Sequence, residues 1–171
     1  MPTDYAQIAA AQDDDGTPAR ELIARYRRGP ALLEGAIAGL TSEQLLAHPI
    51  EGKMSVQEVV CHVADCDQFL ADRMKRIAAM ERPLLVGADG WLYPAALGYA
   101  ERDLALDLAL LAATRAQMAA DLDRLPDGSW ARVGIHTETG LVTLRQMLLH
   151  TIRHIEHHVT TIEEKRAALG A

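Results

Sequence analysis

Apolar residues recur at intervals of three and four along most of the chain, the spacing that places them on one face of an α-helix. Segments containing proline and glycine separate these stretches and end the helices. Four long amphipathic helices are therefore expected, at about residues 18–40, 55–81, 100–125 and 143–169. No segment between them has a convincing strand pattern. The pattern predicts an all-α fold, an antiparallel four-helix bundle with long connecting loops.

Local signals mark where helices begin. Ser55 with Glu58, and Thr143 with Gln146, have the spacing of a capping box, in which side chains and backbone N–H groups at a helix start satisfy each other. Thr17 is expected to cap the first helix, with a proline in its first turn.

Gly29-Pro30 is expected to bend or split that first helix. Two connections, over residues 83–99 and 129–142, are longer than is usual in bundles, and such loops tend to be functional, so we expect them to cover one end of the bundle. Residues 17–171 are expected to form a single domain, preceded by an acidic N-terminal lead-in over residues 1–16.

Composition narrows the function. The 171 residues include 17 Lys and Arg against 24 Asp and Glu, for a formal net charge of −7. Two Trp, four Tyr and one Phe leave few rings for stacking on bases. The acidic balance and scarce aromatic residues argue against nucleic acid as a partner.

Compartment is indicated by the cysteines and the N-terminus. Cys61 and Cys66 lie five apart on a predicted helix and point about 140° apart, so they cannot form a disulfide there, and reduced thiols suit the cytosol. The first residues lack the pattern of a signal peptide, and no stretch is apolar enough to span a membrane. We expect a cytoplasmic protein that does not bind membranes.

The seven histidines are the most informative polar residues. On a helical wheel, His154 and His158 lie about 40° apart on one flank of the apolar face of the last helix. His62 occupies the matching flank of the second helix. Two imidazoles one turn apart and a third on a facing helix form a good site for one metal ion, with positions left open for water or substrate.

The alternative is structural, because a single histidine on such a flank is usually a hydrogen-bonded residue at the edge of the core. The i,i+4 pair and the third histidine favour the metal site, since adjacent buried imidazoles need partners. His150 and His157 are expected to be solvated, and His48 to lie in a loop. The chain has neither a His-Glu-x-x-His nor a Glu-x-x-His sequence, which disfavours zincins and di-iron carboxylate bundles.

Other candidates are weaker. Arg115 lies within an apolar stripe, where it would anchor an anionic substrate or, as the favoured alternative, form a structural ion pair or extend toward solvent. Asp65, one turn from His62, would orient that ligand or be exposed. Cys61 and Cys66 are interpreted as packing residues.

Two blocks of sequence resemble the DinB/YfiT-like superfamily. The first is HPIEGKMSVQEVVCHVAD at residues 48–65, which resembles its second-helix entry. The second combines Trp130-Ala131-Arg132, His136, Gly140 and Thr143-Leu144 with the later His154-x-x-His157-His158. The resemblance covers approximately residues 18–165.

The resemblance implies a four-helix bundle, often dimeric, with a divalent metal ion held by His62, His154 and His158. It also implies a metal-dependent thiol S-transferase that joins a low-molecular-weight thiol to a small electrophile. Two alternatives stay open: a hydrolase using metal-bound water, and a non-catalytic metal-binding or dimerising stress-response bundle. His136 would be a proton shuttle or substrate contact, or would make an ordinary loop hydrogen bond. Imidazole ligands are compatible with Zn²⁺, Ni²⁺, Fe²⁺ or Mn²⁺.

Overall fold

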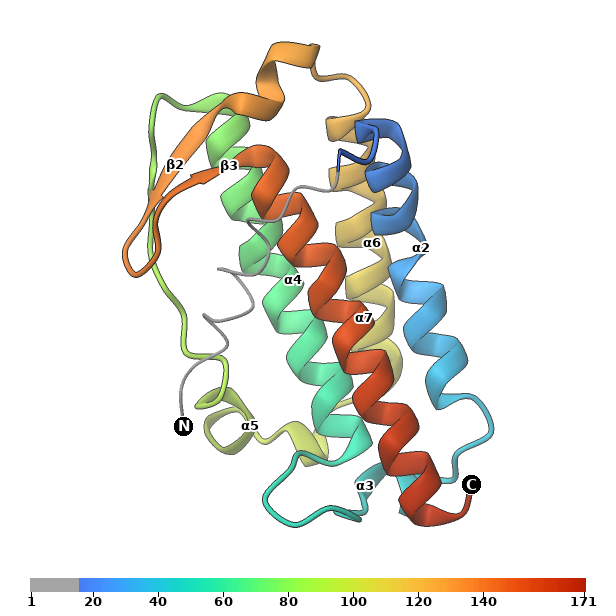
Figure 1. Ribbon diagram of the computed structural model, residues 1–171. Helices are drawn as coiled ribbons and strands as arrows, with labels where there is room; N and C mark the ends of the chain where they lie inside the picture. Colours follow the sequence, from blue (N-terminus) through green and yellow to red (C-terminus); the bar gives the residue numbers. More distant parts are fainter. Residues whose placement is uncertain (1–15) are drawn as a thin grey trace.

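The computed structural model describes residues 16–171, so the expected lead-in lies outside the described residues apart from Gly16. The four long helices are α2 (Ala19–Ile37), α4 (Val56–Ala79), α6 (Leu104–Leu122) and α7 (Leu144–Leu169). They form a four-helix bundle, as the hydrophobic pattern predicts (Figure 1). Within residues 16–171, no helix is both long and apolar enough to cross a membrane.

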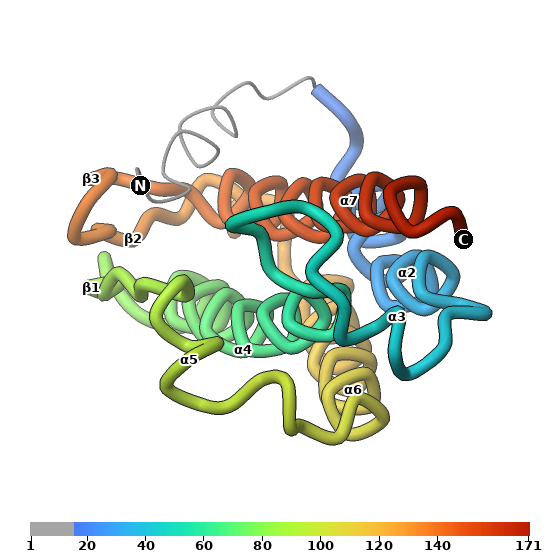
Figure 2. The backbone as a smooth tube through the Cα atoms, turned by 90° about the horizontal axis from the view of Figure 1, so that it is seen from below, coloured from blue at the N-terminus to red at the C-terminus, as the bar shows by residue number. Residues whose placement is uncertain are grey.

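Each long helix packs against two others. Both α2 and α4 contact α6 and α7. Helix α4 runs antiparallel to α7, and α2 runs antiparallel to α6 (Figure 1). Helices α4 and α6 run in the same direction, because the long connection between them returns the chain to the end where α4 began. That connection passes beside α4, on the side away from α2 (Figure 2).

Both predicted capping boxes are present, at the start of the two helices that carry the candidate metal ligands. The Ser55 hydroxyl accepts from the Glu58 N–H at 3.1 Å, and the Glu58 carboxylate accepts from the Ser55 N–H at 2.7 Å. Thr143 and Gln146 make the same reciprocal pair at 3.1 and 2.9 Å. These contacts fix where α4 and α7 begin.

The start and middle of α2 differ from the prediction. Thr17 is not its cap: the cap residue is Pro18, which has no side chain able to accept a hydrogen bond, and no side-chain cap bond forms. Gly29-Pro30 does not split the helix, which continues through Pro30 to Ile37. Proline lacks the N–H that would bond the carbonyl one turn earlier, so the helix needs another donor there.

Arg115 supplies that donor and links all four helices. From α6, its Nη1 donates to the carbonyl of Tyr26 in α2 at 3.0 Å, the carbonyl that Pro30 cannot reach. Its Nη2 donates to the Thr151 carbonyl in α7 at 3.1 Å, and Nε and Nη2 donate to the Asp67 carboxylate in α4 at 2.8–3.1 Å. Burial raises the pKa of Asp67, whereas the charge and the hydrogen bonds of Arg115 act to lower it. The centre of the bundle is therefore a buried ion pair.

Gly29 leaves space for this guanidinium. Alanine is therefore expected to change the free energy of unfolding in opposite directions at two glycines of α2. A Cβ at Gly29 would lie 2.0 Å from Arg115 Nη1, whereas nothing lies within 4 Å of a Cβ at Gly35. We expect Gly29→Ala to lower the free energy of unfolding by about 1–3 kcal/mol through overpacking. Gly35→Ala should raise it by about 0.5–1 kcal/mol, because alanine favours the helix. Urea unfolding of both variants measures the difference, and a stable Gly29→Ala protein would contradict the packing described.

The connections contain a small sheet, so the expectation of strand-free connections is wrong. Strand β1 (Leu84–Leu85) pairs in parallel with β2 (Val133–His136), which pairs antiparallel with β3 (Gly140–Thr143). Gly140 adopts φ 78° where the hairpin turns, a conformation that glycine accepts easily. Strands this short give too little alternation to be recognised in sequence. The other short elements are α3 (Ser42–Leu46), α5 (Tyr93–Ala96) and the 3₁₀ turns η1 (Tyr99–Glu101) and η2 (Asp127–Ala131).

Candidate metal centre

Three buried histidines meet where α4 packs against α7. His62 comes from α4, and His154 and His158 come from successive turns of α7. They are only 4%, 4% and 5% exposed, and one ring nitrogen from each lies within 4.8 Å of the others. The helical wheel thus predicts correctly which histidines share a location. We call His62, His154 and His158 the three-histidine site.

Burial keeps these imidazoles uncharged at neutral pH. It lowers the pKa of His62 to about 4, against smaller opposing effects from the Gly90 backbone and the Asp65 charge. Burial, and then the neighbouring histidines, place the pKa values of His154 and His158 well below the ordinary value. Neutral imidazole is the form whose lone pair binds a metal ion, so no deprotonation is needed at pH 7.

Two of the three donors have the separation expected for ligands of one metal ion, and the His62 donor lies within 4.8 Å of them. The Nε2 atoms of His154 and His158 are 3.2 Å apart. Two nitrogens bound at about 2.0–2.1 Å to a shared ion are separated by roughly 3.0–3.4 Å, depending on the coordination angle. His154 Nδ1 is buried with no hydrogen-bond partner among residues 16–171, which leaves this ring oriented by packing and by what its other nitrogen binds.

The connection before α5 covers His62. The Trp91 ring stacks on the imidazole with centroids 5.8 Å apart, and it remains 49% exposed. The Gly90 backbone comes so close that a Cβ there would lie 3.0 Å from His62 Cε1. The long connection is thus placed beside the histidines, along the side of the bundle. The sequence contains Trp91 but gives no indication that the loop returns to His62.

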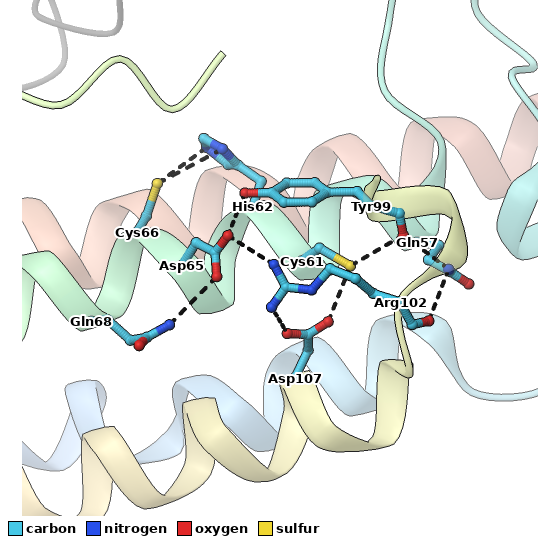
Figure 3. Close-up of polar contacts among 9 residues, drawn as sticks. All are labelled: Gln57, Cys61, His62, Asp65, Cys66, Gln68, Tyr99, Arg102 and Asp107. Carbon is cyan, nitrogen blue, oxygen red and sulfur yellow. Dashed lines mark hydrogen bonds and ion pairs between the residues drawn. The ribbon is translucent and has the colours of Figure 1, made fainter. Parts of the chain in front are cut away.

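A polar network next to His62 holds this connection onto α4 (Figure 3). The Asp65 carboxylate accepts from the Tyr99 hydroxyl at 2.6 Å and from Arg102 at 2.8 Å, and Arg102 also pairs with Asp107 of α6. The Gln57 amide donates to the carbonyls of Tyr99 and Arg102 at 3.1 and 3.3 Å. Asp65 is therefore neither exposed nor hydrogen-bonded to His62. It anchors the loop that leads to Trp91.

The two cysteines differ in surroundings, and no disulfide joins them. The Cys61 thiol donates to Asp107 at 3.2 Å, and burial together with this bond raises its pKa to about 12, so the thiol is unreactive. Cys66 Sγ lies 3.6 and 3.7 Å from the two ring nitrogens of His62. Both cysteines are buried, as predicted, but both also make polar contacts (Figure 3).

Neither Arg115 nor His136, the other two predicted site residues, belongs to the three-histidine site. Arg115 is 0% exposed, and its donors point to Asp67 and to backbone carbonyls, the arrangement of the structural ion pair favoured as its alternative role. We therefore do not assign Arg115 a role in substrate binding.

His136 lies in strand β2 and not in an open loop. It is 2% exposed, and its Nδ1 accepts from the Glu138 N–H at 3.3 Å.

The helical wheel predicts the exposure of the remaining histidines only in part. His48 and His157 are exposed, as expected. The prediction that His150 is solvated is wrong: it is 7% exposed, with its ring centroid 6.2 Å from that of His154. Its surroundings include Arg73 of α4 and His136 of β2, two groups from outside α7 that a helical wheel of one helix cannot place.

Comparisons with a family model, with related sequences and with solved structures all indicate the same family. Residues 25–162 match the family model of the DinB superfamily. A Bacillus licheniformis protein named "putative metal-dependent hydrolase" is 30% identical over 149 residues, covering 86% of this chain and 85% of that protein. YfiT of Bacillus subtilis, named in the same way, is 28% identical over 142 residues, covering 82% and 80%.

The solved structure of YfiT has the same architecture. Its TM-score is 0.85 at 26% identity, over 92% of this chain and 91% of that one. It is described as a probable metal-dependent hydrolase with an unusual four-helix bundle topology. At this similarity, the bundle and its helix order are those of a known fold.

Proposed function

Because the chain belongs to the DinB superfamily, we propose that it is an enzyme that depends on one divalent metal ion held by His62, His154 and His158. The observation that carries the proposal is the convergence of three buried imidazoles from two antiparallel helices, with ligand atoms within 4.8 Å of one another. The names of two relatives support the same class.

Zn²⁺, Ni²⁺, Fe²⁺ and Mn²⁺ all accept imidazole ligands, so three histidines do not distinguish among these four ions. Three neutral ligands leave its charge uncompensated, which favours an anionic ligand in the open positions. When bound, the ion supplies Lewis acidity that lowers the pKa of a thiol or a water beside it.

For the reaction, we propose transfer of a low-molecular-weight thiol to a small electrophile. The thiol sulfur forms a bond to an electrophilic carbon, the leaving group departs with its bonding electron pair, and the thiol proton is released. The chain contributes three neutral imidazoles held in place by packing, and Trp91 and Gly90 lie against one side of His62. Hydrolysis is the second candidate, because two relatives are named as metal-dependent hydrolases.

Turnover assays separate these two reactions. The protein is loaded with each of the four ions and given monochlorobimane with glutathione, cysteine or coenzyme A, and separately p-nitrophenyl acetate without thiol. We expect conjugation to require both ion and thiol, and to disappear in His154→Ala, while His157→Ala retains it. Ester cleavage that needs the ion but no thiol would replace transfer by hydrolysis. A metal-loaded protein inactive in every assay would be a non-catalytic binding bundle.

A further inference from the structure

Three other basic side chains lie beside the three-histidine site, along the same α4–α7 contact. Arg73 follows His62 by eleven residues on α4, a spacing that returns to within about 20° of the same direction. His150 precedes His154 by one turn of α7, and His136 belongs to β2, which contacts α4. Arg73, His136 and His150 are 6%, 2% and 7% exposed. We call Arg73, His136 and His150 the basic cluster.

The surroundings of Arg73 hold its guanidinium in place. Its Cζ lies 4.8 Å from the centre of the Phe69 ring, and its Nη2 donates to the Val86 carbonyl at 2.5 Å. Phe69 is on the preceding turn of α4, and Val86 follows β1, so the position of Arg73 depends on the sheet as well as the helix. A guanidinium fixed in this way loses little freedom when it binds an anion.

The two histidines of the cluster are neutral donors close to that guanidinium. Burial lowers the pKa of His136, and the positive charge of Arg73 lowers it further, against an opposing effect from Glu138. Burial, and then Arg73 and His136, lower the pKa of His150 to about 4. Strand pairing places His136 opposite Leu85, and Arg73 donates to the carbonyl of the next residue, Val86, so both side chains lie at the same edge of the sheet. Because His136 Nδ1 accepts a hydrogen bond, the neutral ring carries its proton on Nε2.

We propose that the basic cluster is the subsite that binds a carboxylate of the molecule whose reacting end lies at the three-histidine site. This inference rests on the proposed function, because it assigns the other end of the same substrate or thiol. A planar guanidinium matches a carboxylate with two parallel hydrogen bonds, and neutral imidazoles add donors. His136 then acts as a substrate contact, one of the roles predicted from sequence.

The spacing indicates the shape of the ligand. His150 is about 6 Å along the helix axis from His154, and Arg73 is about 16 Å along the axis from His62. The acidic group and the reacting atom therefore belong to opposite ends of an elongated small molecule. A short acidic peptide thiol has this form, whereas a small neutral thiol has nothing to place against Arg73.

Calorimetry with an acid and its ester tests the subsite directly. Zinc-loaded protein is titrated at pH 7 with glutathione and with glutathione diethyl ester, which has the same thiol but no free carboxylate. We expect the acid to bind about 10- to 100-fold more tightly, the usual effect of charge-assisted hydrogen bonds. Arg73→Gln should remove this preference with zinc content unchanged, and Arg73→Lys should restore part of it.

Arg76→Gln is the matched control, because Arg76 lies on the same helix, pairs with Asp72 at the surface and is about half exposed. It should keep the preference of the unaltered protein. Equal binding of acid and ester, or binding of neither, overturns the proposal, as does an Arg73→Gln protein that weakens both ligands equally. His136→Gln gives an independent result if Arg73 variants do not fold, and an unchanged preference there also counts against the subsite.

The same titrations distinguish failure of the subsite from failure of the proposed function. They are repeated on protein stripped of zinc. A preference for the acid that persists there, in a protein that takes up no metal, retains the subsite and rejects the metal-dependent enzyme. Zinc-dependent binding without a preference for the acid does the reverse.

Discussion

Asp67→Ala is expected to lower the free energy of unfolding by about 3–5 kcal/mol, because it leaves a buried positive charge without its counter-charge. Arg115 and Asp67 are both 0% exposed, and three hydrogen bonds of 2.8–3.1 Å join them. The guanidinium cannot reach water without separating all four helices. Urea unfolding at pH 7, followed by circular dichroism, measures the loss.

Two controls show whether burial is the cause. Asp123→Ala removes an ion pair with Arg27 whose partners are each about half exposed, and it should cost less than about 1 kcal/mol. Combining Asp67→Leu with Arg115→Met should cost clearly less than the sum of the single changes, since neither charge is then left alone. A loss from Asp67→Ala no greater than that from Asp123→Ala would mean that the pair does not hold the bundle together.

His62→Ala and His154→Ala are each expected to abolish stoichiometric metal binding. Each change removes one of three ligands and leaves a pair, and even the loss of a residue that only supports a ligand weakens metal sites by about 10–100-fold. The expected loss is therefore larger than about 100-fold in affinity. Equilibrium dialysis against zinc at pH 7, with elemental analysis of the protein, measures it.

His157→Ala is the matched control for these variants. Its ring centroid lies 5.3 Å from that of His158, but the side chain is exposed and is not one of the three converging ligands. It should bind metal like the unaltered protein. A chain that keeps its metal after either His62→Ala or His154→Ala does not use the three-histidine site.

Local chemistry explains how much of the fold could be predicted from the sequence. The capping boxes of α4 and α7 involve residues three apart, so their donors and acceptors can be identified without knowing the fold. The path of α2 through Pro30 depends instead on Arg115, which is distant in sequence and supplies the donor that proline lacks. The sequence did contain one indication of the partner of Arg115, because Asp67 is a charged residue among the apolar positions of α4.

The candidate site divides in the same way. Helical periodicity predicts that His62, His154 and His158 share a location, because each lies on the inner flank of a long helix. Its surroundings depend on where the connections run. The stacking of Trp91 on His62 and the burial of His150 follow from tertiary contacts that no periodicity predicts.

Metal content of the native preparation tests the central claim most directly. Protein purified without added metal or chelator is passed through gel filtration and analysed for zinc, nickel, iron and manganese. The three-histidine site predicts about one divalent ion per chain, with none retained in a variant combining His62→Ala and His154→Ala. A native protein that contains no stoichiometric metal and takes up none on dialysis would contradict the proposed metal-dependent function.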